Sequence, residues 1–156
     1  LIRKLVDASN FNTGYFCCRQ LSFGMLDMAW HTQNEPFEGD VIAFEKQAWA
    51  RTVIVPEVPG TFMSSSFGHI FSGGYAAGYY GYKWAEVLDA DAFSVFKATG
   101  IFNRETARSF RENVLSKGGT EDPAILYKRF RGQEPTIDAL LIRNGIKQTE
   151  PKANSN

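Results

Sequence analysis

Residues 69–84, HIFSGGYAAGYYGYKW, bring together the side chains of this sequence that could carry chemistry. The segment holds one of the two histidines, an adjacent pair of glycines and four of the six tyrosines. A free phenol has a pKa near ~10, so at neutral pH it is an uncharged donor that can stabilise an oxyanion without losing its proton. The candidate groups are His69, Tyr75, Tyr79 and Tyr82, with Gly73 and Gly74 beside them as a tight turn or a hinge.

The spacing of the tyrosines predicts that three of them share one face of a helix. On a helical wheel of residues 75–95, Tyr75, Tyr79 and Tyr82 gather on one side at i, i+4 and i+7. A row of phenols turned away from the core is most useful where it lines a cleft. Aromatic stripes at helical spacing are more often packing than catalysis, so the pattern alone leaves both interpretations open. The opposite stripe, which we expect to be buried, consists of Ala77, Tyr80, Trp84, Val87 and Leu88.

Two other kinds of site lack the residues they need. A catalytic zinc ion takes three protein ligands, but the chain has only His31 and His69, no H-E-x-x-H motif, and cysteines at the adjacent positions 17 and 18. We therefore assign no metal ligand in this chain. Residues 72–74, SGG, precede the predicted helix and could cradle a phosphate, although no P-loop motif and no preceding strand accompany them.

Helical patterns dominate the remainder of the chain. They predict a buried helix over residues 15–31 with an inner face made by Phe16, Leu21, Met25, Met28 and Ala29. A second helix follows Asp40 as N-cap, and further helices are predicted over 104–117, 123–131 and 135–145. The long tyrosine helix ends at Gly100 and either bends or restarts near Asp91, an acid within its apolar stripe. The sequence therefore predicts an all-α fold, with residues 1–147 as one helical piece and residues 148–156 as a polar, disordered tail.

The composition narrows the range of partners. Seventeen basic residues balance seventeen acidic ones, so no net field attracts nucleic acid or an anionic membrane. No stretch reaches the roughly 18 apolar residues that span a bilayer, and the opening LIRKLVDASN lacks the apolar core of a signal peptide. We expect no nucleic-acid or membrane partner and a cytoplasmic location, with the periplasm as the alternative because the compartment depends on upstream residues. A start at Leu1, inside an amphipathic pattern, is typical of a fragment.

Three motifs, in order along the chain, resemble a known family. They are FGHIFSGGYAAGYYGYKW, the GGTEDP turn, and RFRGQEPTIDALL. Together with the sequence between Phe11 and Ile146, they resemble the C-terminal region of the thimet oligopeptidase family of zinc metallopeptidases, and within it the bacterial dipeptidyl carboxypeptidases most. The resemblance implies the C-terminal part of a zincin-like, predominantly helical catalytic domain.

The resemblance also implies roles for the candidate residues. In the family, the residue matching Tyr82 donates a hydrogen bond to the developing oxyanion, which implies a catalytic role. The matches of His69 and Tyr79 contact the substrate, the match of Tyr75 supports the same wall, and Gly73-Gly74 corresponds to a mobile loop. Zinc is the cofactor of the complete enzyme, held by an H-E-x-x-H helix and a later glutamate that this chain lacks.

These roles imply that the complete protein hydrolyses short peptides, releasing C-terminal dipeptides, whereas this piece binds no zinc and is inert alone. Its partners are then peptide substrates and the missing N-terminal part, and the apolar surface which that part would cover predicts self-association. The residues by themselves fit a non-catalytic helical module that binds peptides with its tyrosine face. An H-E-x-x-H motif upstream in the same reading frame would favour the peptidase.

Overall fold

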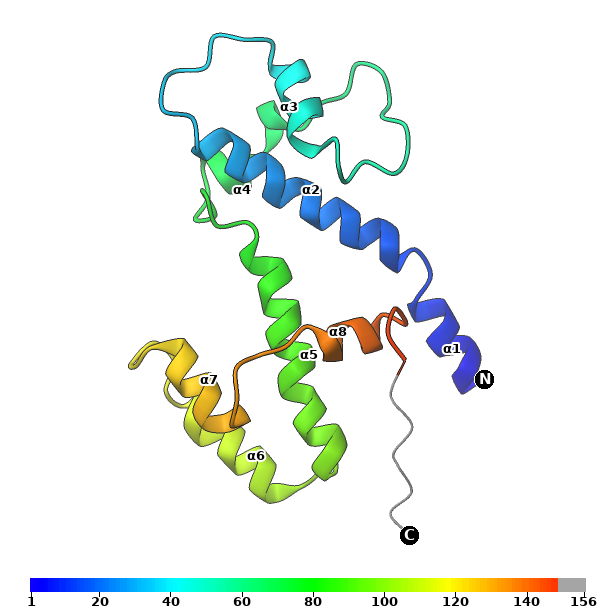
Figure 1. The fold of residues 1–156 in the computed structure, drawn as a ribbon, viewed down its shortest axis with the longest axis vertical. Coiled ribbons are helices and arrows are strands. Elements are labelled where there is room, and N and C mark those ends of the chain that lie inside the picture. Colours follow the sequence, from blue (N-terminus) through cyan, green and yellow to red (C-terminus); the bar gives the residue numbers. More distant parts are fainter. Residues whose placement is uncertain (149–156) are drawn as a thin grey trace. The chain divides into compact units, whose positions relative to one another are not determined.

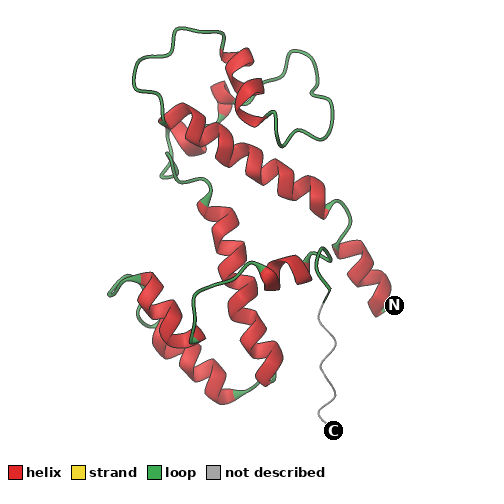
Figure 2. Cartoon of the chain, viewed as in Figure 1, coloured by secondary structure: helices red, strands yellow, loops and turns green. Residues whose placement is uncertain are grey.

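The computed structural model describes residues 1–148, and every regular element within them is a helix (Figure 2). The predicted all-α fold is confirmed. The chain divides into two compact units, Leu1–Trp84 and Ala85–Asn156. The extent of a single piece over residues 1–147 stays a prediction, and residues 149–156 of the expected tail lie outside the described part. None of the helices in residues 1–148 is long and apolar enough to cross a bilayer.

One long helix organises the first unit. It is α2 (Thr13–His31), which follows α1 (Ile2–Ser9) and packs against α3 (Val41–Trp49) (Figure 1). A 3₁₀ turn at Ser64–Ser66 leads into the short α4 (Gly68–Phe71), which lies beside the carboxyl end of α2. The buried core of this unit consists of Phe23, Leu26, Phe67, Ile70 and Tyr79.

The helix α2 forms where the sequence predicts it, but a different face is buried. Three residues of the predicted inner face are between 39% and 58% exposed, namely Phe16, Leu21 and Met28. Phe23 and Leu26 are buried instead, and the Phe23 ring packs 5.3 Å from the ring of Phe67. The partner that selects the buried face therefore lies far along the chain, where the periodicity of α2 alone does not reveal it.

The helix α3 and the connection after it follow the sequence signals. The Asp40 carboxylate accepts hydrogen bonds from the backbone N–H groups of Ile42 at 2.8 Å and Ala43 at 3.1 Å, which is the predicted N-cap. Residues 53–62 form no regular structure, as their prolines and Gly60, at a φ of +81°, predict.

The boundary between the units falls after Trp84, inside α5 (Gly81–Thr99). The second unit contains the rest of α5 and then α6 (Arg104–Phe110), a π-helical turn (Arg111–Leu115), α7 (Pro123–Arg131) and α8 (Asp138–Arg143) (Figure 1). Gly100, at a φ of +107°, follows the end of α5, and Asp122 caps α7 with Pro123 in the first helical position. Val87, Ala90 and Leu140 form a small core.

Asp91 does not break α5, because it belongs to a buried polar cluster. Its carboxylate is 1% exposed and accepts hydrogen bonds from Arg131 Nε at 2.9 Å and from the Tyr127 hydroxyl at 2.6 Å. Burial alone raises the pKa of Asp91, but the hydrogen bonds from Tyr127 and Arg131 outweigh it and hold the pKa below its usual value. No new helix starts here, and α5 continues to Thr99.

The helix predicted to start near Tyr75 begins only at Gly81, so this prediction is wrong for residues 75–80. Residues 72–80 form turns instead. Three glycines weaken the helical preference of this stretch, and Ala77 adopts a φ of +53°, a left-handed conformation that interrupts a right-handed helix. The SGG sequence consequently does not stand at the N-terminus of α5, and the phosphate cradle loses its basis.

Candidate functional site

Four predicted site residues meet in the first unit. The ring centroids of Tyr75 and Tyr82 are 5.0 Å apart with planes 26° from parallel, and those of Tyr79 and Tyr82 are also 5.0 Å apart. The ring of His69, on α4, lies 5.9 Å from Tyr75 and 6.0 Å from Tyr79. We refer to these four residues as the tyrosine cluster. The structure thus brings together the residues that the sequence singled out, while their roles stay predictions.

The members of the tyrosine cluster differ in exposure. Tyr79 is only 8% exposed, and its ring lies 5.2 Å from that of Phe67 and 5.7 Å from that of Phe23. The prediction that Tyr79 faces open space is wrong, because the turn of residues 72–80 directs its ring into the core of the unit. Tyr75 and Tyr82 are 39% and 40% exposed and form the accessible side of the cluster.

The predicted buried stripe is also only partly correct. Tyr80 and Trp84 are 61% and 50% exposed, whereas Val87 is 6% exposed. The wheel does not apply to Tyr80, which precedes α5, and neither core cluster of the described residues includes Trp84. The prediction is wrong for these two side chains and also for Ala77, which is exposed. It is partly correct for the half-buried Leu88 and correct for Val87.

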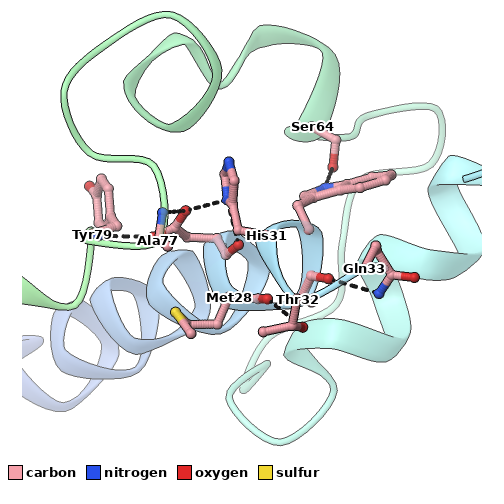
Figure 3. A network of polar contacts seen from close by, with 10 residues as sticks. Met28, His31, Thr32, Gln33, Ser64, Ala77 and Tyr79 are labelled. Carbon is pink, nitrogen blue, oxygen red and sulfur yellow. Dashed lines mark hydrogen bonds and ion pairs between the residues drawn. The ribbon is translucent and has the colours of Figure 1, made fainter. Parts of the chain in front are cut away.

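Asp27 of α2 holds the turn that carries the tyrosine cluster. Its carboxylate is fully buried, at 0% exposure, and accepts the Ala77 N–H on one oxygen and the Tyr79 N–H on the other, both at 2.9 Å (Figure 3). Hydrogen bonds to a charged group contribute roughly 1.5–3 kcal/mol each. A left-handed non-glycine residue such as Ala77 costs roughly 1–2 kcal/mol. The two bonds therefore offset the strain of the turn.

His31 is the third donor to this carboxylate. Its Nδ1 atom lies 2.8 Å from one Asp27 carboxylate oxygen and 2.8 Å from the Asp27 carbonyl oxygen (Figure 3). Since both neighbours are acceptors, Nδ1 must carry a proton. His31 therefore supports Asp27, and its Nδ1 is not free to bind a metal or a substrate.

A second buried carboxylate anchors the chain ahead of His69. Glu45 of α3 is 2% exposed and accepts hydrogen bonds from the backbone N–H groups of Met63 at 2.7 Å and Ser64 at 2.6 Å. The Ser64 hydroxyl donates to the same carboxylate at 2.6 Å. It also accepts a hydrogen bond from Trp30 Nε1 at 3.0 Å, which Figure 3 shows. Side chains from α2 and α3 thus both hold the 3₁₀ turn that precedes α4.

Positions 73 and 74 require glycine to different degrees. A Cβ atom on Gly73 would lie 2.9 Å from the His69 carbonyl oxygen, because the Gly73 N–H donates to the Gly68 carbonyl at 2.8 Å and holds the chain against α4. A Cβ atom on Gly74 would meet nothing within 4 Å. Close packing explains the glycine at position 73, and the mobility expected of the pair stays a prediction.

The Tyr82 hydroxyl is kept protonated. Its hydrogen bond with Tyr75, and secondly its desolvation, raise the pKa of Tyr82 to about 12. At neutral pH Tyr82 is therefore an uncharged donor on the accessible side of the cluster. Such a group can donate a hydrogen bond to an oxygen atom that becomes negatively charged.

The described residues do not fit a metal ion. Within residues 1–148, no group of three or more His, Cys, Asp or Glu side chains is arranged to hold one. His69 is exposed beside the tyrosines, but the cluster offers no second ligand of these types. We assign no chemical step to a metal in this chain.

The first unit also contains a cavity of about 360 Å³, and none of the residues that line it belongs to the tyrosine cluster. It lies between α2, α3 and residues 52–63, and one of its walls is Phe23, whose ring also packs against Tyr79. Apolar side chains such as Trp49, Val55 and Phe62 line much of the remainder. A cavity of this size and lining suits an apolar group of a ligand.

The sequence interpretation missed Asp27 and Glu45, the two residues that hold the site in shape. A pointer to Asp27 exists, since it is a lone acid in an apolar helix, four residues before a histidine. Glu45 carries no comparable pointer, because it looks like one of the outward charges of α3. In both cases the bound N–H groups belong to segments that only folding brings near.

Known proteins resemble this chain along almost its whole length. The model of Peptidase family M3 matches residues 1–146. The chain is 48% identical to oligopeptidase A of Escherichia coli K12 over 148 residues, which is 94% of the chain and 22% of that protein. It is 42% identical to the dipeptidyl carboxypeptidase of the same organism over 149 residues, which is again 94% of the chain and 22% of that protein.

A plant relative adds a third comparison. The chain is 41% identical to the probable cytosolic oligopeptidase A of Arabidopsis thaliana over 149 residues, or 92% of the chain and 21% of that protein. The chain therefore spans about a fifth of the length of these relatives. Because the family model covers nearly every residue, including the whole tyrosine cluster, the chain belongs to peptidase family M3.

Proposed function

We propose that the complete protein containing this chain is a zinc-dependent peptidase that hydrolyses short peptides, with the tyrosine cluster as part of the wall that contacts the substrate. Tyr82 donates a hydrogen bond to the oxyanion that forms when the peptide carbonyl is attacked. Tyr75 and His69 contact the peptide beside it. Tyr79, which is largely buried, supports the ring of Tyr82 from the core side.

The pairing of Tyr75 with Tyr82 is the observation that carries this proposal. The two rings are stacked and accessible, and Tyr82 stays protonated far above neutral pH. The turn that presents them is held by a buried carboxylate, which limits the reorganisation needed when charge develops. The cavity on the far side of Phe23 could take an apolar side chain of a longer peptide.

The metal belongs to the remainder of the complete protein in this proposal. Residues 1–148 supply no ligand set for it. When bound, zinc would polarise the peptide carbonyl and lower the pKa of a water molecule. The contribution of this chain is to bind and orient the peptide and to donate hydrogen bonds.

Replacing Tyr82 by Phe tests the catalytic role in the complete protein. The ring and its packing are kept and the donor is lost, so we expect kcat for a short peptide to fall by about two to three orders of magnitude while KM changes little. Tyr80→Phe is the matched control, because Tyr80 is 61% exposed and lies outside the cluster. Equal activities of the two variants would overturn the role of Tyr82.

The finer proposal, release of C-terminal dipeptides, depends on recognition of a free carboxylate. A peptide with a free C-terminus should lose its last two residues, and the same peptide with a C-terminal amide should be cleaved much more slowly. Mass spectrometry of the products separates this activity from internal cleavage. Equal cleavage of both peptides at an internal bond would rule out dipeptide release and leave short-peptide hydrolysis in place.

A non-catalytic peptide-binding module is the competing function, favoured by the lack of a ligand set in residues 1–148. The purified 156-residue chain should hydrolyse no peptide, whereas the complete protein should do so and should be inhibited by a zinc chelator. Peptide binding without hydrolysis by the complete protein would support the module. Chelator-sensitive hydrolysis by the chain alone would contradict our assignment of the metal ligands.

We also propose a cytoplasmic location for the complete protein. One relative has a name that describes it as a probable cytosolic enzyme. Fractionation of cells that express the complete gene would test this location, and recovery in the periplasmic fraction would refute it.

A further inference from the structure

We propose that Asp27 is a positioning residue, which fixes the turn of residues 75–80 and thereby places the Tyr82 hydroxyl. Its kinetic consequence rests on the proposed function, whereas its structural consequence does not. Asp27 lies on α2, and the backbone amides that it binds, those of Ala77 and Tyr79, follow it by 50 and 52 positions in the sequence.

The geometry of the carboxylate dictates the shape of the turn. Its two oxygens each accept one backbone N–H at 2.9 Å, from positions 77 and 79. Two amides separated by a single residue can converge on one carboxylate only when the chain curves tightly between them. The positive φ of Ala77 supplies that curvature.

The turn continues directly into the first residues of α5. The Tyr82 N–H donates to the Tyr79 carbonyl at 3.2 Å, and the Gly81 N–H donates to the Gly78 carbonyl at 3.0 Å. The Tyr75 ring, at the start of the turn, stacks on the Tyr82 ring at its end. A displacement of residues 77–79 therefore displaces both the backbone and the ring partner of Tyr82.

The charge of Asp27 matters as well as its shape. Three donors converge on it, namely the two amides and the protonated Nδ1 of His31. An asparagine has the same size but only one acceptor oxygen, so its NH₂ group would face an N–H donor. Asp27→Asn should therefore release one of the two amides without creating a cavity.

Hydrogen exchange of the unaltered protein is the first test. Read at single-residue resolution in the complete protein, the amides of Ala77 and Tyr79 should exchange at least about tenfold more slowly than that of Ala76, for which the described residues show no hydrogen-bond partner. Equal exchange of the three amides would overturn the proposal. This measurement needs no variant and so does not depend on the folding of one.

Asp27→Asn in the complete protein is the second test. We expect about tenfold faster exchange at position 77 or 79, with the amides of α3 unchanged, and a fall of kcat of about 10- to 100-fold with little change in KM. Asp91→Asn is the matched control, because it removes an equally buried carboxylate from the other unit. It should leave the exchange of residues 77 and 79 unaltered.

Rescue distinguishes positioning from a general loss of stability. Ala77→Gly removes the strain of the left-handed conformation. The double variant Asp27→Asn, Ala77→Gly should therefore have a kcat at least about threefold higher than Asp27→Asn alone. Unchanged exchange at positions 77 and 79 in Asp27→Asn, or a kcat no lower than that of Asp91→Asn, would overturn the inference. If Tyr82→Phe retains full activity while Asp27→Asn alters the exchange, the proposed catalytic role of Tyr82 fails and the structural role of Asp27 stands.

Discussion

At the scale of single residues, chemically identical side chains acquire different properties from their surroundings. The rings of Tyr75, Tyr79 and Tyr82 lie within 6.5 Å of one another, yet Tyr79 is buried and the other two are accessible. Tyr82, which is 40% exposed and has the raised pKa, is the residue that we assign as the donor. Composition and spacing pointed to the group, but only the contacts separate its members.

The pKa of Tyr82 gives a direct prediction for alkaline pH. Because hydrogen bonding with Tyr75 raises it to about 12, Tyr82 should titrate after an ordinary tyrosine, and Tyr75→Phe should move its pKa down toward 10. Absorbance of phenolate near 295 nm, compared between the unaltered protein and Tyr82→Phe, isolates this titration. A Tyr82 pKa of about 10 in the unaltered protein would contradict the hydrogen bond.

The same shift fixes how stability changes with pH. Between about 10 and about 12, folded Tyr82 keeps a proton that the unfolded chain releases, so the free energy of unfolding should fall as pH rises through this window. The stabilisation that comes from the raised pKa of Tyr82 is fully present below pH 10 and is lost above the pKa of the folded state, about 12. Denaturant unfolding of Tyr82→Phe at the same pH values should show a smaller fall.

At the scale of elements, most helices could be predicted from local signals and their buried faces could not. Asp40, Asp122 and Gly100 mark helix ends through interactions with residues close in sequence. The buried face of α2 depends on Phe67, more than forty positions from Phe23. Apolar periodicity gives two acceptable faces for such a helix, and the partner decides between them.

The tyrosine turn shows the same limit more strongly. Its helical wheel grouped Tyr75, Tyr79 and Tyr82 correctly, although residues 75–80 are not helical. The backbone there is held by Asp27, through hydrogen bonds that span 50 and 52 positions. A local pattern contains no information about such bonds, so the group was predictable while its geometry and the burial of Tyr79 were not.

The two adjacent glycines of this turn give a prediction at the same scale. Gly73→Ala should lower the free energy of unfolding by about 1–3 kcal/mol, because its Cβ would overlap the His69 carbonyl, a backbone atom that cannot move aside alone. Gly74→Ala should stay within about 0.5 kcal/mol, because its Cβ would meet open space. Denaturant unfolding of the two variants provides the comparison.

Activity of the same pair tests the predicted mobility. If turnover requires Gly74 to change conformation, Gly74→Ala should lower kcat although its stability is unchanged. Full activity of Gly74→Ala would show that the turn needs glycine for close packing at position 73 alone. Equal stability of the two variants would contradict the close approach of Gly73 to α4.

At the scale of the whole molecule, many large apolar side chains of the described residues are exposed. Ile2 and Leu5 on α1 are 79% and 61% exposed, and Phe11 just after it is 76% exposed. The relatives are more than four times as long as this chain, which leaves ample sequence to cover these side chains in a complete protein. The apolar side chains of α1 and of Phe11 are exposed to water when the chain is produced alone.

We therefore expect the isolated 156-residue chain to associate with itself. Burial of apolar surface drives association, so the average sedimentation coefficient should rise with protein concentration. The double variant Ile2→Lys, Leu5→Lys removes apolar area from one face of α1 and adds like charges, so it should sediment closer to a monomer at the same concentrations. A concentration-independent monomer for the unaltered chain would show that its exposed apolar residues are too dispersed to form an interface. The complete protein should remain unaffected by concentration over the same range, because the segments that cover this face are then present.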